Sequence, residues 1–160
     1  MIVRYSRQSL RWLSRNSVNV QSLTDIIMHL CSREGTYRKF LRIHIKPRAI
    51  NSDFMFWTNT INVAVESSAK KPRHYKLKKM LRNLLHELRH FIQYRIYKKP
   101  FTFSYTYRDM QLVNDKYWND PDEIDARKYE SKYLNFIYKK IIKQPPHHLQ
   151  VPRWPLHRLL

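Results

Sequence analysis

An apolar stripe at helical spacing, within residues 74–98, constrains the fold of this chain more than any other feature. Its members lie three or four positions apart: Leu77, Met80, Leu81, Leu84, Leu85, Leu88, Phe91 and Ile92. Side chains with this spacing share one face of an α-helix, so the stripe predicts a long amphipathic helix. Pro100 follows and cannot continue it. The apolar face of this helix must be covered by other elements of the chain.

Three shorter patterns precede the long helix. Residues 22–33 repeat apolar side chains at helical spacing, which predicts a short helix. Residues 39–46 alternate apolar and polar side chains, the pattern of a strand. Residues 54–66 are typical of a hairpin or of two short strands, interrupted near Thr58 and Asn59. This mixture predicts the α+β class, with a small antiparallel or mixed sheet.

A second long helix is predicted from Pro121 to about residue 143. Asp120 can cap its first turn, and proline suits the first helical position. Acidic residues are concentrated in its first turns, where the helix dipole favours negative charge. Between the two long helices, residues 101–118 are aromatic and irregular, with the best strand pattern at 101–107.

Length and composition favour one domain with a basic segment at each end. The chain has 160 residues, of which 42% are apolar, enough to form a core without disulfides. We expect the domain to span residues 22–143. Residues 1–21 contain four Arg and no acidic residue, so a basic N-terminal arm is expected there. Residues 144–160 contain four prolines, so an extended basic tail is expected.

The charge balance of the chain is strongly basic. Thirty-one Lys and Arg oppose twelve Asp and Glu, for a formal net charge of +19. Such a protein attracts polyanions, so nucleic acid is a candidate partner. Two lysine-rich clusters with interleaved tyrosines, residues 70–79 and 138–144, suit a phosphate backbone. A solvated helix face has the same composition and is the alternative interpretation.

Other features of the composition exclude several classes of protein. The single cysteine, Cys31, excludes an internal disulfide and fits a reducing compartment. A single glycine excludes a Gly-rich phosphate loop. The start of the chain lacks the pattern of a secretory signal peptide, which favours an intracellular, cytoplasmic or virion-associated location. No apolar run is long enough for a membrane span, so none is expected.

The predicted long helix contains the motif His-Glu-x-x-His, formed by His86, Glu87 and His90. Histidines four positions apart lie one above the other on a helix, so both imidazoles can reach one metal ion. Two histidine ligands and a glutamate general base form the arrangement of zinc peptidases, in which Zn²⁺ activates a water molecule. The alternative interpretation is a surface helix with a cluster of Glu, His and Arg charges.

A third metal ligand is needed for such a site. The extended motif with a third histidine is excluded, because Gln93 and Ile96 stand where glycine and histidine are required. No histidine occurs within residues 91–146, whereas seven of the twelve acidic residues fall within residues 109–130. The candidates are therefore acidic: Asp122, Glu123 and Asp125.

His-Glu-x-x-His followed by Glu-Ile-Asp-Ala on a later helix resembles the gluzincin branch of zinc metallopeptidases. The layout is similar to small forms of this branch, such as the metallopeptidase domains of antirepressor-cleaving and stress-response regulators. The resemblance covers about residues 54–138. It implies a zincin-like domain in which His86, His90 and Glu123 bind zinc and Glu87 is the catalytic base.

The resemblance also implies roles for residues around the ligands. Ala126 would be the small residue that lets the two helices approach closely, and Asp125 would orient a ligand histidine. A peptide substrate would add to an edge strand near the active-site helix. Residues 60–66 are the best candidate for that strand, with the alternating side chains Ile61, Val63 and Val65. A buried core strand is the alternative interpretation of the same pattern.

The expected function is therefore zinc-dependent hydrolysis of peptide bonds in a protein or peptide substrate, in the vicinity of nucleic acid. The alternative is a non-catalytic, basic binding or assembly protein with a structural zinc, such as a component of a viral particle. Four tyrosines between or near the predicted ligands could stabilise an oxyanion, and the sequence favours none of them: Tyr105, Tyr107, Tyr117 and Tyr129.

Overall fold

A computed structural model describes residues 1–34, 40–47, 49–65, 70–95, 97–98 and 114–142 of the chain. Helices and a small sheet form an α+β fold, as predicted. The described elements, in chain order, are β1 (Ile2–Tyr5), α1 (Arg7–Arg15), α2 (Val20–Ser32), β2 (Phe40–Lys46), β3 (Asp53–Met55), the 3₁₀ helix η1 (Phe56–Thr58), β4 (Thr60–Ala64), α3 (Arg73–Arg95), α5 (Asn114–Asn119) and α6 (Pro121–Ile142).

The four strands form one mixed sheet in the order β1-β2-β4-β3. Strands β1, β2 and β4 run parallel, and β3 pairs with β4 in the antiparallel direction. The register places Ile43 opposite Ile61 and Ile45 opposite Val63, and all four side chains are buried. A shift of one residue would turn them to the other face of the sheet, so burial fixes the register.

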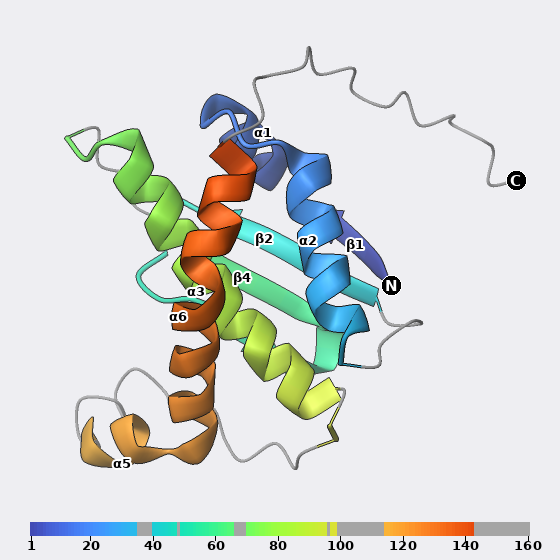
Figure 1. Ribbon diagram of the computed structural model, residues 1–160, viewed down its shortest axis with the longest axis vertical. Coiled ribbons are helices and arrows are strands. Elements are labelled where there is room, and N and C mark those ends of the chain that lie inside the picture. The colour runs from blue at the N-terminus through green and yellow to red at the C-terminus, as the bar shows by residue number, and fades with distance from the viewer. Residues whose placement is uncertain (35–39, 48, 66–69, 96, 99–113, 143–160) are drawn as a thin grey trace, which may run out of the picture.

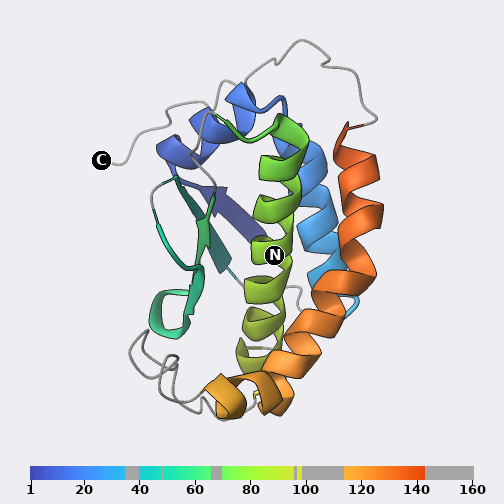
Figure 2. The ribbon, with the colours of Figure 1, turned by 90° about the vertical axis from the view of Figure 1, so that its left-hand side faces the viewer.

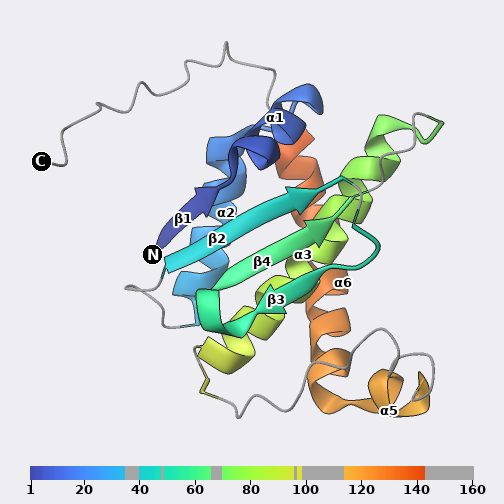
Figure 3. The ribbon, with the colours of Figure 1, turned by 180° about the vertical axis from the view of Figure 1, so that it is seen from behind.

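Helices cover one face of this sheet, and α6 adds a further layer. Helices α2 and α3 lie on the covered face, and α6 crosses α3 on the side away from the strands (Figure 1, Figure 2). Seen from behind, the strands lie in front of the helices, and α1 lies at one end of the sheet (Figure 3). The core between the layers contains the apolar stripe of α3. Burial of each of its large side chains stabilises the fold by about 1.5–3 kcal/mol.

The sequence patterns locate most elements correctly. Helix α2, strand β2 and the long helices α3 and α6 agree with the predicted elements to within a few residues at each end. The interrupted strands are β3 and β4, separated by η1 and Asn59. Asn59 has φ 49° and ψ 46°, a left-handed conformation that asparagine tolerates better than most residues. Across the described residues, no helix combines the length and apolar character needed to cross a membrane.

The remaining segments are the short helix α5 and two predicted elements in the C-terminal half of the chain. Helix α5 was not predicted, because an element of six residues is too short to show a period. The predicted strand at 101–107 and the predicted tail at 144–160 lie outside the described residues.

The predicted N-terminal arm over residues 1–21 is wrong, because most of this segment is folded. Strand β1 extends the parallel part of the sheet, and α1 packs against β2. Leu13 of α1 is fully buried. The Ser9 hydroxyl donates to Ile43 O at 3.2 Å and accepts from Ile45 N at 2.7 Å, which ties α1 to β2. The arginines of this segment occupy exposed positions, so their charge does not oppose its folding.

The prediction that residues 60–66 form an edge strand for the substrate is also wrong. Strand β4 is internal, because it pairs with β2 on one side and with β3 on the other. Ile61, Val63 and Val65 are buried and belong to the core. The core-strand interpretation of this pattern is therefore correct, and the edge on this side of the sheet is β3.

Candidate metal centre

Two neighbouring helices, α3 and α6, bring the candidate ligands together. His86 and His90 lie one turn apart on α3, and Glu123 lies in the first turn of α6. The contact between these helices is the most extensive between any two described elements. Ala126 lies fully buried in α6, and so small a side chain lets two helix axes approach closely.

The position of Glu123 follows from the way α6 begins. Asp120 caps this helix, as predicted, because its Oδ1 accepts a hydrogen bond of 2.8 Å from the backbone N–H of Asp122. The carbonyl of Asp120 also accepts from the backbone N–H of Ile124 at 2.9 Å. Pro121 is the first helical residue. A fixed first turn holds the Glu123 side chain against α3.

The side chains of His86, His90 and Glu123 converge on one point. His86 Nε2 lies 3.0 Å from Glu123 Oε2, and His90 Nε2 lies 3.2 Å from Glu123 Oε1. The two Nε2 atoms are 3.2 Å apart, and one ligand atom from each residue lies within 4.8 Å of the others. Two imidazole nitrogens and one carboxylate oxygen are a donor set that zinc binds in proteins. These residues therefore fit a zinc ion.

Glu123 is the acidic candidate whose carboxylate reaches both imidazoles. The other two candidates have different partners. Asp125 Oδ2 accepts hydrogen bonds from Arg89 Nε at 2.7 Å and from Gln93 Nε2 at 2.8 Å. Asp122 lies beside Tyr94. Burial is the main cause of the raised pKa of Tyr94, and the charge of Asp122 and a hydrogen bond with Asp122 raise it further.

A chain of hydrogen bonds behind His90 fixes its ring. His90 Nδ1 donates to Gln93 Oε1 at 2.9 Å, which leaves Nε2 facing Glu123. Gln93 is fully buried, and its Nε2 donates to Asp125 and to the carbonyl of Asp122 at 3.0 Å. Asp125 was predicted to orient a ligand histidine, and Gln93 stands between the two. Partners of this kind set the tautomer of a metal-binding histidine, and their loss typically lowers metal affinity about 10–100-fold.

Arg89, inside the motif, joins three helices. Besides the bond to Asp125, its Nη1 lies 3.9 Å from Glu34 Oε1, just after the end of α2. Its guanidinium also lies 5.1 Å from the centre of the Tyr129 ring on α6. The side chain of Arg89 is 14% exposed, so these interactions are largely shielded from water. They hold the outer part of the hydrogen-bond chain in place.

Glu130 is the corresponding partner of the other histidine. His86 Nδ1 lies 3.7 Å from Glu130 Oε2, and Glu130 Oε1 forms an ion pair with Arg82 Nε at 3.2 Å. Sequence reasoning missed Glu130 and Gln93. The available signal was spacing: Gln93 follows His90 by three positions and Glu130 follows Glu123 by seven, so each shares a helix face with a candidate ligand.

The histidines and Glu123 form an ion-paired cluster. Burial lowers the pKa of His86, but hydrogen bonds to Glu123 and Glu130 outweigh burial and raise it to about 10. The pKa of His90 is raised too, because burial is outweighed by its hydrogen bond to Glu123 and by nearby negative charge. Burial raises the pKa of Glu123, but both histidines hold it well below its usual range. A metal ion that binds here must displace protons from the imidazoles.

Glu87 is a buried carboxyl group beside this cluster. It is 7% exposed, and burial raises its pKa to about 7 although the neighbouring imidazoles oppose the shift. A carboxyl group with this pKa exchanges protons readily near neutral pH. Asp53 of β3 is among the charges that raise the pKa, and β3, the edge strand, packs against α3, the helix that carries Glu87.

Of the four tyrosines considered for an oxyanion, the structure describes two, and one of these reaches the cluster. Tyr117 of α5 has a raised pKa because of burial, the charge of Glu123 and a hydrogen bond with Glu123. Tyr129 is buried and lies under Arg89 instead. Tyr105 and Tyr107 lie outside the described residues.

Comparisons of this chain with protein-family models, with curated proteins and with solved structures returned no match. The resemblance to gluzincins therefore remains a prediction from the motifs.

Proposed function

We propose that this protein is a zinc-dependent peptidase in which His86, His90 and Glu123 bind the metal. The convergence of these three side chains from two helices carries the proposal. When bound, zinc acts as a Lewis acid and lowers the pKa of a water molecule to about 7. Catalytic zinc sites have three protein ligands and structural sites have four, and the described residues provide three.

Glu87 is the proton carrier in this proposal. Its carboxylate accepts a proton from the attacking water and passes it to the nitrogen of the departing amine. The water oxygen forms a bond to the carbonyl carbon as the peptide C–N bond breaks. The raised pKa of Glu87, about 7, supports this role. Tyr117, which forms a hydrogen bond with Glu123, is the hydroxyl group proposed to donate to the developing oxyanion.

The proposed substrate is a protein or peptide segment that adds a strand to β3. This strand is at the edge of the sheet and packs against α3, the helix that carries the motif. Backbone hydrogen bonds to an edge strand hold a peptide in an extended conformation. Because β3 packs against the helix that carries Glu87, such a peptide would pass near the proton carrier.

Glu87→Gln tests the proposal, because glutamine has the shape of glutamate but cannot carry the proton. The zinc-loaded variant is expected to keep the metal content of the wild type and to cleave labelled casein at least about 100-fold more slowly. Release of labelled peptides measures the cleavage. Asp25→Asn, an equivalent change on the exposed face of α2, is the control and is expected to cleave at the wild-type rate.

Two results would contradict the proposal in different ways. Cleavage by Glu87→Gln at the wild-type rate would show that Glu87 does not carry the proton. A zinc-loaded wild type that cleaves no protein would favour the non-catalytic alternative, in which the metal stabilises a basic binding protein.

A further inference from the structure

Charge is distributed unevenly along the helices α3 and α6. Residues 70–82, at the start of α3, contain seven Lys and Arg and no acidic residue. Residues 131–142, at the end of α6, contain three Lys and no acidic residue. Residues 120–130, at the start of α6, contain five acidic residues. The positive and negative charges of the helix pair are therefore concentrated in different segments.

Contacts between the helices show that the two basic segments lie side by side. Lys78 Nζ of α3 lies 5.1 Å from the centre of the Tyr138 ring of α6. At the other end of the pair, His90 meets Glu123. The helices are thus antiparallel, and the basic start of one lies against the basic end of the other.

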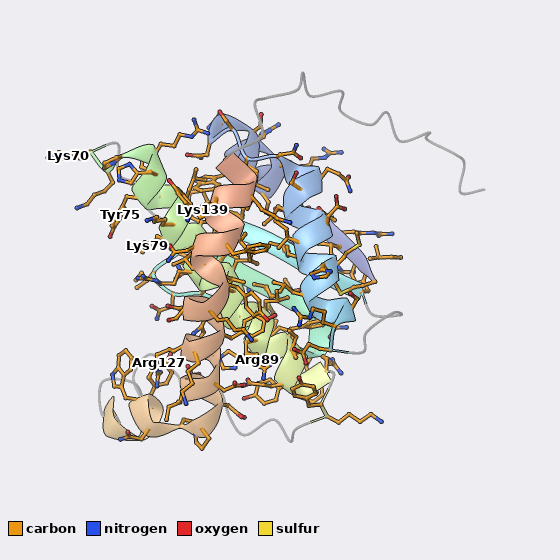
Figure 4. The ribbon with its side chains drawn as sticks, viewed as in Figure 1. Lys70, Tyr75, Lys79, Arg89, Arg127 and Lys139 are labelled. Atoms are coloured by element: carbon orange, nitrogen blue, oxygen red, sulfur yellow. The ribbon has the colours of Figure 1, made fainter. Side chains whose placement is uncertain are left out.

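Labelled side chains show where the basic residues of the two helices lie. Figure 4 shows Lys70, Tyr75 and Lys79 along the start of α3 and Lys139 on the upper part of α6, whereas Arg127 lies toward the opposite end of the molecule. Lys70, Lys79 and Lys139 are all exposed. Lys139 comes from a segment far from Lys70 and Lys79 in the sequence, so folding adds the end of α6 to the charge run at the start of α3.

Helix α1 adds a row of arginines at the same end. Arg7, Arg11 and Arg15 lie four positions apart on α1, so they form one stripe, and all three are exposed. Arg73 Nε at the start of α3 donates to the carbonyl of Asn16 at 2.8 Å. Figures 1 to 3 show α1, the start of α3 and the end of α6 at one end of the molecule. We call α1 with residues 70–82 and 131–142 the basic end.

We propose that the basic end binds nucleic acid through its phosphate backbone. Clustered Lys and Arg bind phosphates by releasing condensed counterions, and three elements present such charges here. Tyr75 and Phe136 are 43% and 53% exposed, and Lys71 and Lys140 lie 5.5 and 4.8 Å from the centres of these rings. Exposed aromatic rings among cations are suited to stacking with unpaired bases.

The packing of the helices favours nucleic acid over a lipid surface. A helix that binds a bilayer buries an apolar face in it. The apolar faces of α3 and α6 are already buried in the hydrophobic core, which includes Leu77, Leu84, Leu134 and Ile141. The basic end therefore offers mainly charge and single exposed rings.

Most of the proposed nucleic-acid surface lies away from the candidate metal centre, and Arg82, which pairs with Glu130 beside His86, marks its boundary. Glu123 and Lys139 lie near opposite ends of α6, about 24 Å apart at about 1.5 Å per residue. The acidic residues near Glu123 would repel phosphate, whereas the basic end would attract it. A bound polyanion would leave the metal centre accessible, so this proposal does not depend on the proposed peptidase activity.

The test measures binding of a fluorescein-labelled oligonucleotide, single-stranded and as a duplex, to the full chain by anisotropy. One basic residue from each segment is reversed in the test variant: Arg11→Glu, Lys71→Glu and Lys139→Glu. Near physiological salt, this triple is expected to bind at least about tenfold more weakly. The slope of its plot of log affinity against log salt concentration is expected to be smaller in magnitude than the wild-type slope, by about 2 for the single strand and about 3 for the duplex.

The matched control reverses three exposed charges on strands β1 and β2, with the same change in net charge: Arg4→Glu, Arg42→Glu and Lys46→Glu. It is expected to keep most of the wild-type affinity and salt dependence. Circular dichroism and thermal unfolding report whether each triple folds. If a triple fails to fold, the single substitutions are measured, each with about a third of the change in slope.

Three results would overturn the proposal. Equal losses in both triples would show that net charge, not the basic end, determines binding. A wild type that binds neither oligonucleotide at low salt would exclude the surface. Binding to phosphatidylserine vesicles but not to oligonucleotide would identify lipid as the ligand. Glu87→Gln is expected to bind oligonucleotide as the wild type does. A failure of the peptidase proposal can therefore be distinguished from a failure of the nucleic-acid proposal.

Discussion

The protonation of individual residues determines how the candidate metal centre responds to pH. In the zinc-free protein the pKa of His86 is about 10, so its imidazole is protonated at neutral pH. Zinc binds the neutral imidazole, and binding must release this proton. Zinc affinity is therefore expected to rise at least about tenfold per pH unit across neutral pH, and to level off above the pKa of His86.

A competition titration with a chromophoric zinc chelator at several pH values measures this dependence. The sign follows from the raised pKa: protons compete with zinc below it and no longer compete above it. An affinity that does not change across neutral pH would contradict the ion-paired cluster. Asp25→Asn, at an exposed position of α2 and outside the cluster, is expected to show the same dependence as the wild type.

Single residues of the site were predictable where their spacing is local. His86, Glu87 and His90 lie within one helix, and the helical period alone places them together. Glu123 required the resemblance to a known family, because the packing of two distant helices brings it to the histidines. Gln93 was missed because a buried amide has no distinctive pattern in the sequence.

At the scale of helices and strands, the close approach of α6 to α3 is the feature on which the site depends. Ala126 is fully buried in α6, between Glu123 and Glu130 in the sequence. Ala126→Leu is expected to destabilise the fold by about 1–3 kcal/mol through overpacking. It is also expected to weaken zinc binding, because it moves the Glu123 carboxylate away from the imidazoles.

Urea unfolding of the zinc-free variant and a zinc competition titration measure the two effects. Ser131→Leu adds a similar side chain at an exposed position of the same helix and is the control. It is expected to change the free energy of unfolding by less than about 0.5 kcal/mol. Equal stability and zinc affinity for Ala126→Leu and the wild type would contradict the close packing of α6 on α3.

Helices and strands with longer sequence patterns were predicted more reliably than those with short patterns. Helices α3 and α6 span many turns, so the apolar period or the start signals identify them. Strand β4 shows why pairing was not predictable. Its alternation of side chains is the same in an edge strand and an internal strand, and only partners distant in the sequence distinguish the two.

At the scale of the whole molecule, the N-terminal segment is part of the fold and not an appendage. Leu13 of α1 is fully buried, whereas Leu10 on the same helix is 41% exposed. Leu13→Ala is therefore expected to destabilise the protein by about 2–5 kcal/mol. Leu10→Ala is the matched control, expected to cost about 0.5 kcal/mol or less.

Thermal or urea unfolding of the two variants measures the difference. Similar small losses for Leu13→Ala and Leu10→Ala would mean that residues 1–21 form an arm after all. The prediction from the sequence was wrong here because all the charged residues of this nine-residue amphipathic helix are arginines, three in number, which suggested a basic arm. In a short helix, exposed charges outnumber the buried positions that reveal the fold.

The arrangement of charge over the whole molecule links the two proposals. The candidate metal centre lies among acidic residues at the start of α6, and the basic end lies at its other terminus. A protein with both sites could act on another protein that is bound to the same nucleic acid. That combined role requires first that the cluster bind zinc.

Metal content, measured by elemental analysis of the purified protein, tests that requirement most directly. The wild type is compared with His86→Ala and Glu123→Ala, which remove one candidate ligand from each helix. We expect one zinc per chain in the wild type and none retained by either variant. No zinc in a wild type purified without chelator, and none taken up on addition, would contradict the site and reduce the motif to a charged helix face.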